Sequence, residues 1–369
     1  MSNSIKLITS LFLCGVVFFL SASVMCQSVP GVYIFGDSLV DVGNNNHLPL
    51  SLLKANFPHN GVDFPTGEAT GRFSNGKNAA DFLAEKVGLP TAPPYLSSKS
   101  EVPITGVSFA SGGAGLLNRT DDLFVRRMHL KTNVRQAISM TQQVDYFALV
   151  HDHLVQQLGS DGARAHLAKS LFVIVIGSND LFAYFHNNSK VSKKYTPQQY
   201  VDLMASTFKQ LIKRLYGMEA RKFVVTGVGV IGCCPARRKE TATSECKVEA
   251  NNWSTKYNDG LKLLLQDLKL ELSEINYSYF DTYGVMNNII QNPQTYGIIE
   301  TKEACCGLGN MKADVPCIPI ATYCSNRRDH LFWDRVHPTE IVSSLFANLL
   351  YNGTQEVTFP INVEQLAKL

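Results

Sequence analysis

The chain has 369 residues, of which 45% are hydrophobic, and its formal net charge at pH 7 is +3. This composition supports a large packed core and excludes a disordered chain, because no low-complexity or repeated segment is present. The sequence also lacks long runs of like charge and basic stripes interleaved with aromatic residues, so we expect no nucleic-acid partner.

The first residues have the layout of a secretory signal peptide. Lys6 precedes an apolar run over residues 7–20, and small and polar residues follow. The run is shorter than the ~20 residues needed to span a bilayer, which disfavours the alternative of a membrane anchor. We therefore expect a signal peptide over residues 1–26, cleaved near Cys26, and a secreted protein with no stable membrane anchor.

Short apolar runs alternate along the chain with longer segments in which apolar residues recur at helical spacing. Buried strands are expected at residues 32–35, 104–109, 171–176, 223–226 and 277–280. Helices are expected at residues 79–87, 134–158, 200–215, 248–272 and 340–350. Strands that alternate with helices predict an α/β fold in which a parallel sheet carries helices on both faces. No linker interrupts the pattern, so residues 27–369 are expected to form one domain, with insertions at 43–78 and 300–328.

Glycines and small polar residues follow three of the predicted strands. Ser38 comes after the first strand, Gly112 after the second and Asn179 after the third. The carboxyl ends of parallel strands meet at one edge of the sheet, where ligands of open α/β folds bind. Near the C-terminus, Asp334 lies three residues before His337, just ahead of the last predicted helix.

These residue types can fill the roles that ester cleavage by a serine requires. The reaction needs a nucleophile, a base, a group that orients the base, and donors for the oxyanion. Ser38 suits the nucleophile, and its own amide suits an oxyanion donor. His337 is the expected base and Asp334 its orienting acid. The amide of Gly112 and the carboxamide of Asn179 would complete the oxyanion hole, and no metal or organic cofactor is required.

Six sequence blocks occur in a specific order along almost the whole mature chain. They start at Phe35 (FGDSLVDVGNN), Gly71 (GRFSNG), Phe109 (FASGGAG), Ile176 (IGSND), Ala304 (ACCG) and Phe332 (FWD, with HPTE following). In this order they resemble the plant GDSL esterase/lipase branch of the SGNH hydrolases.

The resemblance implies a flavodoxin-like, three-layer α/β/α sandwich with a five-stranded, mostly parallel sheet. It also implies the site roles already assigned: Ser38 as nucleophile, Gly112 and Asn179 as oxyanion donors, and His337 supported by Asp334. For a plant protein, the expected location is the apoplast or the cell wall.

Seven cysteines remain after removal of residues 1–26, and all lie in the C-terminal part of the chain. An odd number in a secreted protein predicts local disulfides and one unpaired thiol. The resembled family usually reads Gly-Cys-x-Pro where this chain has a second cysteine, which makes Cys234 the candidate for that thiol. The disulfide candidates are Cys233, Cys246, Cys305, Cys306, Cys317 and Cys324. No Cys-x-x-Cys pair or nearby histidine supports zinc, so we expect no metal.

Five Asn-x-Ser/Thr tripeptides are candidate glycosylation sites, which fits a secreted surface. They begin at Asn118, Asn187, Asn252, Asn276 and Asn352.

Other readings of the sequence are weaker. Residues 227–232 fit the Gly-x-Gly-x-x-Gly dinucleotide fingerprint, but no helix opens directly from them. The lipase elbow Gly-x-Ser-x-Gly is incomplete around Ser108, which disfavours an α/β-hydrolase fold.

The expected function is hydrolysis of a small-molecule, lipid or polysaccharide ester. An extracellular acyltransferase using the same acyl-enzyme, or less favourably a silent binding protein, remains as an alternative.

Overall fold

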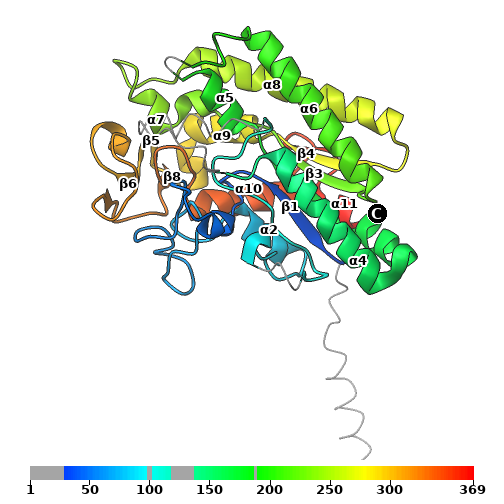
Figure 1. The fold of residues 1–369 in the computed structure, drawn as a ribbon. Coiled ribbons are helices and arrows are strands. Elements are labelled where there is room, and N and C mark those ends of the chain that lie inside the picture. Colours follow the sequence, from blue (N-terminus) through cyan, green and yellow to red (C-terminus); the bar gives the residue numbers. More distant parts are fainter. Residues whose placement is uncertain (1–28, 98–101, 118–136, 187–188) are drawn as a thin grey trace, which may run out of the picture.

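The computed structural model describes residues 29–97, 102–117, 137–186 and 189–369. Within them, a five-stranded sheet lies between two layers of helices (Figure 1). Its strands are β1 (Val32–Gly36), β2 (Leu171–Val175), β3 (Lys222–Thr226), β4 (Asn276–Phe280) and β9 (Thr358–Pro360), in the order β1-β2-β3-β4-β9. The first four are parallel and β9 is antiparallel to β4. The expected α/β/α sandwich with a mostly parallel sheet is confirmed.

Side chains alternate between the two faces of the sheet, as the pleat of a strand requires. Tyr33 and Phe35 of β1 belong to the core on one face, where the rings of Tyr33 and Phe172 stack 5.2 Å apart. Val32 and Ile34 belong to the core on the other face. The first core is covered by α4 (Met140–Lys169), α6 (Pro197–Gly217) and α8 (Val248–Glu271). The second is covered by α2 (Ala79–Lys86), α9 (Thr282–Gln291), α10 (Glu340–Asn352) and α11 (Val363–Lys368).

The strand expected at residues 104–109 is wrong, and the fifth strand of the sheet is β9, which lies beside β4 at the opposite edge. The segment runs beside β1, since the amides of Val32 and Ile34 donate to the carbonyls of Thr105 and Val107 at 3.0 Å. A regular strand does not form, because Gly106 has a φ of 115°, outside the extended region, and only an isolated bridge joins Ile34 to Ser108. The three residues of β9 are too few to give a periodic signal.

The helix expected at residues 134–158 begins later and ends later. Ser139 and Gln142 form a capping box that starts α4 at Met140, and residues 134–136 lie outside the described part of the chain. The helix assignment continues past Gly159, whose φ of 72° makes a kink, to Lys169. The other four expected helices, α2, α6, α8 and α10, lie within a few residues of their predicted bounds.

Shorter elements complete the described structure. The helical ones are η1 (Asn44–His47), η2 (Tyr95–Ser97), α5 (Ser178–Tyr184), η3 (Ile231–Cys233), α7 (Pro235–Arg238), η4 (Pro293–Tyr296) and η5 (Asn310–Lys312). The insertion at 300–328 holds β5 (Glu300–Ala304), β6 (Cys306–Gly307) and β7 (Thr322–Tyr323), and β8 (His330–Phe332) follows it and pairs with β5.

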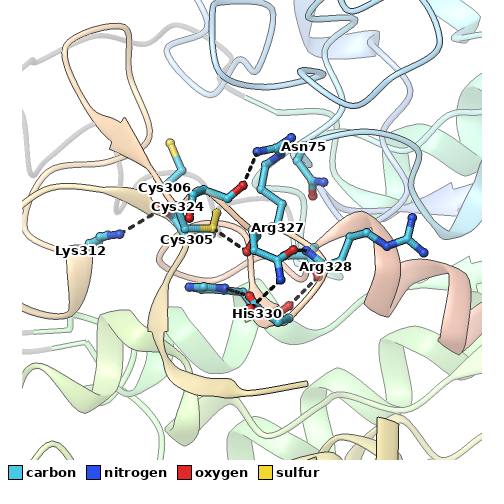
Figure 2. The surroundings of a disulfide bond; sticks show 12 residues. Asn75, Cys305, Cys306, Lys312, Cys324, Arg327, Arg328 and His330 are labelled. Atoms are coloured by element: carbon cyan, nitrogen blue, oxygen red, sulfur yellow. Dashed lines mark hydrogen bonds and ion pairs between the residues drawn. A yellow bond between two sulfur atoms is a disulfide. The ribbon is translucent and has the colours of Figure 1, made fainter. Parts of the chain in front are cut away.

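Three disulfides cross-link the C-terminal part of the chain, and two of them lie within this insertion. They join Cys233 to Cys246, Cys305 to Cys324 and Cys306 to Cys317, while Cys234 is the buried free thiol, as expected. Figure 2 shows Cys305, Cys306 and Cys324 gathered close to Arg327 and His330. The amides of the adjacent Cys305 and Cys306 donate to the carbonyls of Phe332 and Trp333, at 2.9 and 2.6 Å. The disulfides therefore brace the backbone that leads into the C-terminal site segment.

The candidate glycosylation sites differ in their exposure. Asn252 and Asn352 are exposed, whereas Asn276 is half-buried and its side-chain amide donates to the Glu274 carbonyl at 3.2 Å. Asn118, Asn187 and the expected signal peptide lie outside the described residues. In the part of the chain that the structure describes, no helix is long and apolar enough to cross a membrane.

Candidate active site

Four of the five predicted site residues come together beyond the carboxyl edge of the sheet. Ser38 lies two residues after β1, Asn179 lies in α5 just after β2, and both line one pocket together with His337. Asp334 and His337 come from the segment between β8 and α10. Each of these four residues is only 9% exposed.

The side chains of Ser38, His337 and Asp334 form a continuous hydrogen-bonded chain. The Oγ of Ser38 lies 2.7 Å from Nε2 of His337, and Nδ1 of His337 lies 2.7 Å from Oδ2 of Asp334. A carboxylate accepts but cannot donate, so the Nδ1 nitrogen carries the imidazole proton. The unprotonated Nε2 is then free to accept the hydroxyl hydrogen of Ser38.

The turn that holds Asp334 and His337 is built by the aspartate itself. Its Oδ1 accepts the backbone N–H groups of Val336 and His337, both at 2.9 Å. The amide of Trp333 closes the turn by donating to the carbonyl of His337 at 2.8 Å. Burial alone would raise the pKa of Asp334, but the charge of His337 and these hydrogen bonds together hold it below its ordinary value. Asp334 is therefore an ionised carboxylate at neutral pH.

Phe73 also packs against the imidazole, and the sequence did not single it out. Its ring centroid lies 5.0 Å from that of His337. The loop that carries Phe73 is tied to the start of α10: the amide of Lys77 donates to Glu340, and the amide of Glu340 donates to the side chain of Asn75, both at 2.8 Å. The sequence block GRFSNG marks this loop, but nothing in its pattern indicates which side chain faces the histidine.

The amide of Gly112 is already engaged. It donates to Oδ2 of Asp41 at 2.9 Å, and Oδ1 of Asp41 accepts the amides of Gly43 and Asn44 at 2.8 Å. Burial raises the pKa of Asp41 to about 6, although hydrogen bonds from the amides of Gly43, Gly112, Asn44 and Asn45 oppose this shift. Space at Gly112 is also filled, because a Cβ there would lie 2.5 Å from the ring of Phe73.

Two other donors face the site more freely. The side-chain nitrogen of Asn179 donates one hydrogen to the carbonyl of Ala114 at 2.9 Å, which leaves its second hydrogen available. Among the residues that the structure describes, no partner is found for the backbone amide of Ser38. Ser38 and Asn179 both line the pocket that opens at the Ser38 hydroxyl.

Asp37 is a buried carboxyl group next to the serine. Burial raises its pKa to about 7, against the lowering effects of the Leu39 amide and of His337. Its Oδ1 accepts the amide of Leu39 at 3.0 Å, whereas Oδ2 has no hydrogen-bond partner within the described part of the chain. No pattern in the sequence predicts a carboxyl group here that titrates near neutrality.

An apolar pocket opens at Ser38 and His337 and extends along the sheet face covered by α10. Across the described residues, no group of three or more His, Cys, Asp or Glu is arranged to hold a metal ion. The glycines at 227–232 run into short helical turns, η3 and α7, and not into the long helix that a dinucleotide fingerprint requires.

Known proteins resemble the chain over most of its length. The family model described as GDSL-like Lipase/Acylhydrolase matches residues 32–350. A GDSL esterase/lipase of Arabidopsis thaliana is 47% identical over 350 residues, which cover 92% of this chain and 90% of that relative. A second Arabidopsis GDSL esterase/lipase is 36% identical over 343 residues, covering 92% and 86%. Among solved structures, an acetylxylan esterase from Geobacillus stearothermophilus aligns over 87% of this chain and 92% of its own, with 14% identity and a TM-score of 0.37.

Proposed function

Because the chain belongs to the GDSL-like lipase/acylhydrolase family, we propose that it cleaves carboxylic esters through Ser38, His337 and Asp334. As a member of this family the chain is a carboxylic ester hydrolase that acts on ester substrates. The assignment of the individual residues rests on one observation, the hydrogen-bonded chain from Ser38 Oγ through the imidazole to the Asp334 carboxylate.

In the first half of the reaction, Nε2 of His337 takes the hydroxyl proton of Ser38 while Oγ bonds to the ester carbonyl carbon. The carbonyl π electrons move to its oxygen, and the carboxylate of Asp334 stabilises the imidazolium. The tetrahedral intermediate then collapses, the C–O bond to the alcohol breaks, and the alcohol leaves with the proton from Nε2. An acyl-enzyme remains, and water activated by the same imidazole releases the acid.

The oxyanion needs hydrogen-bond donors that are in place before the charge develops. The Ser38 amide, which has no partner among the described residues, and the second hydrogen of Asn179 are suitable. We retain Gly112 as a third donor. Since its amide hydrogen is directed at Asp41, it must be shared between that carboxylate and the oxyanion when substrate is bound.

The cellular location and the modifications of the enzyme follow from the same family. We propose that residues 27–369 form one secreted domain after removal of the signal peptide. Three disulfides in the structure fit an oxidising compartment. Asn252 and Asn352 are the more accessible glycan acceptors, since both are exposed.

A fluorophosphonate probe tests the assignment of the nucleophile. The purified protein is expected to be labelled and to release acid from an acetyl ester, and Ser38→Ala is expected to lose both while keeping its melting temperature. A Ser38→Ala protein that retains wild-type turnover would overturn the assignment. Product analysis with and without added polyol separates hydrolysis from acyl transfer, because transfer gives a new ester in place of free acid.

A further inference from the structure

A buried carboxyl group ties the start of α5 to the loop segment of residues 114–117. Asp180, the third residue of α5, is fully buried. Its Oδ2 accepts the backbone amide of Leu116 at 2.9 Å, and its Oδ1 accepts the backbone amide of Leu117 at 3.3 Å. The two oxygens of one side chain therefore hold two consecutive amides of the segment. None of the roles assigned above uses this carboxyl group.

The neighbouring residue of α5 holds the same segment. The side-chain nitrogen of Asn179 donates to the carbonyl of Ala114 at 2.9 Å. A closed ring of contacts results, which runs from Asn179 to Ala114, along the backbone to Leu116, and back through Asp180. Since both sides of this ring are short stretches of backbone, the segment has little freedom to slide along α5.

The ring decides where the second hydrogen of Asn179 points. The two N–H bonds of a carboxamide diverge at a fixed angle, so once the first is directed at the Ala114 carbonyl, that carbonyl sets the direction of the second. A donor to an oxyanion is effective when it is aimed before the charge develops. The place of residues 114–117 beside α5 therefore governs how well Asn179 can donate to a bound ester.

The other end of α5 is held independently. Arg237, which is 5% exposed, donates through Nη2 to the carbonyl of Phe182 at 2.8 Å. Its guanidinium also lies 5.4 Å from the centroid of the Phe182 ring. Because these contacts fix α5 to α7, we expect loss of the Asp180 contacts to displace residues 114–117 and not the helix.

We propose that Asp180 is a positioning residue of the active site, which sets the direction in which Asn179 donates to the oxyanion. This inference rests on the proposed function, because it takes Asn179 to be an oxyanion donor. In this role Asp180 touches neither the substrate nor the reacting atoms. It acts through residues 114–117 and through the side chain of Asn179.

Asp180→Asn tests the role with a minimal change of shape. The oxygen of an asparagine can accept one of the two segment amides, but its NH2 group meets the other as donor against donor. We expect kcat for an acetyl ester to fall about tenfold while KM stays within about twofold, since a misdirected donor loses part of the roughly 10²- to 10³-fold effect of one that is removed. The melting temperature should fall as well, so turnover is measured well below the unfolding transition.

A double-mutant cycle with Asn179→Ala separates positioning from a purely structural role. Asn179→Ala alone is expected to lower kcat by about 10²-fold. In the Asn179→Ala protein, Asp180→Asn is then expected to lower kcat by less than about twofold more, because the donor that Asp180 aims is gone. An equal loss in both backgrounds overturns the proposal, and so does an Asp180→Asn protein with wild-type kcat.

Asp81 provides the matched control, since it is the third residue of α2 and is 2% exposed. Its Oδ2 accepts the backbone amide of Asn78 at 2.9 Å. Asp81→Asn is expected to lower the melting temperature, and any effect on kcat should be the same with and without Asn179. Coupling of Asp81→Asn to Asn179→Ala as strong as that of Asp180→Asn would contradict the proposal.

Asp180→Glu replaces Asp180→Asn in the cycle if the asparagine protein does not fold, because it keeps both acceptor oxygens and displaces them by one methylene group. Wild-type kcat in Asn179→Ala overturns this inference while leaving Ser38 as the nucleophile. Failure of the proposed function is distinct, since it appears as ester turnover that survives Ser38→Ala.

Discussion

Replacement of Asp334 by asparagine should abolish most turnover while leaving the fold intact, because the two oxygens of Asp334 have different hydrogen-bond partners. Oδ1 of Asp334 accepts two backbone amides, from Val336 and His337, so the amide oxygen of an asparagine is held at that position. The NH2 group then occupies the position of Oδ2, which is the nearer contact to Nδ1 of His337, at 2.7 Å against 2.9 Å for Oδ1. It donates to Nδ1 and forces the imidazole proton onto Nε2.

The consequence is a base in the wrong tautomer. Nε2 lies 2.7 Å from Ser38 Oγ and can no longer accept the hydroxyl proton. Loss of kcat by about 10⁴-fold, equivalent to about 5 kcal/mol in the activation barrier, is the magnitude known for this change in serine triads. Steady-state hydrolysis of an acetyl ester, with thermal unfolding measured in parallel, is the assay.

A second Asp–His pair provides the matched control. Asp329 Oδ1 lies 2.6 Å from Nδ1 of His330, only a few residues away and outside the pocket lining. Asp329→Asn is expected to change kcat by less than about twofold. If Asp334→Asn kept more than about a tenth of wild-type turnover, the tautomer explanation would be refuted.

Three further changes test the surrounding structure. Gly112→Ala should lower turnover, because its Cβ meets the ring of Phe73 at 2.5 Å, and Phe73→Ala in the same chain should restore part of the loss; no loss in the single variant contradicts this. Burial raises the pKa of Asp37 from 3.8 to about 7, so the wild type loses unfolding free energy as pH rises through that range. In urea unfolding, the unfolding free energy of Asp37→Asn relative to that of the wild type should rise by at most about 4 kcal/mol between pH 4 and pH 8. A free-energy difference between the two proteins that does not change with pH refutes the raised pKa of Asp37. Removing the Cys305–Cys324 disulfide, which closes a separation of 19 residues, should lower the unfolding free energy by about 3 kcal/mol, and an unchanged urea midpoint argues against it.

The architecture was predictable because its signals are local. Buried apolar runs identified β1, β2, β3 and β4, and helical spacing identified the helices that cover them. The segment before Phe109 had the composition of a strand but not its backbone, since Gly106 breaks the extended path. The edge strand β9 has only three residues, Thr358–Pro360, and was not identifiable by periodicity.

The sequence was enough to propose the residues of the site, but it did not indicate what surrounds them. Ser38, Asp334 and His337 were identified from their places after strands and before a helix, and the structure brings them within hydrogen-bonding distance. The engagement of Gly112 by Asp41 depends on two loops 71 residues apart, and no spacing within one sequence reports such a contact. The same holds for the packing of Phe73 on the imidazole.

The short turn from Asp334 to His337 makes the acid and the base a single mechanical unit. The two amides on Oδ1 fix both residues to each other, so a displacement of the whole segment changes the separation of Nε2 from Ser38 Oγ before it changes the contact between Asp334 and His337. An inhibitor or a loosened disulfide acting on this segment would silence the enzyme without disturbing the Nδ1 proton. The enzyme could then be fully inactive while the proton resonance of its Asp334–His337 pair stayed unchanged.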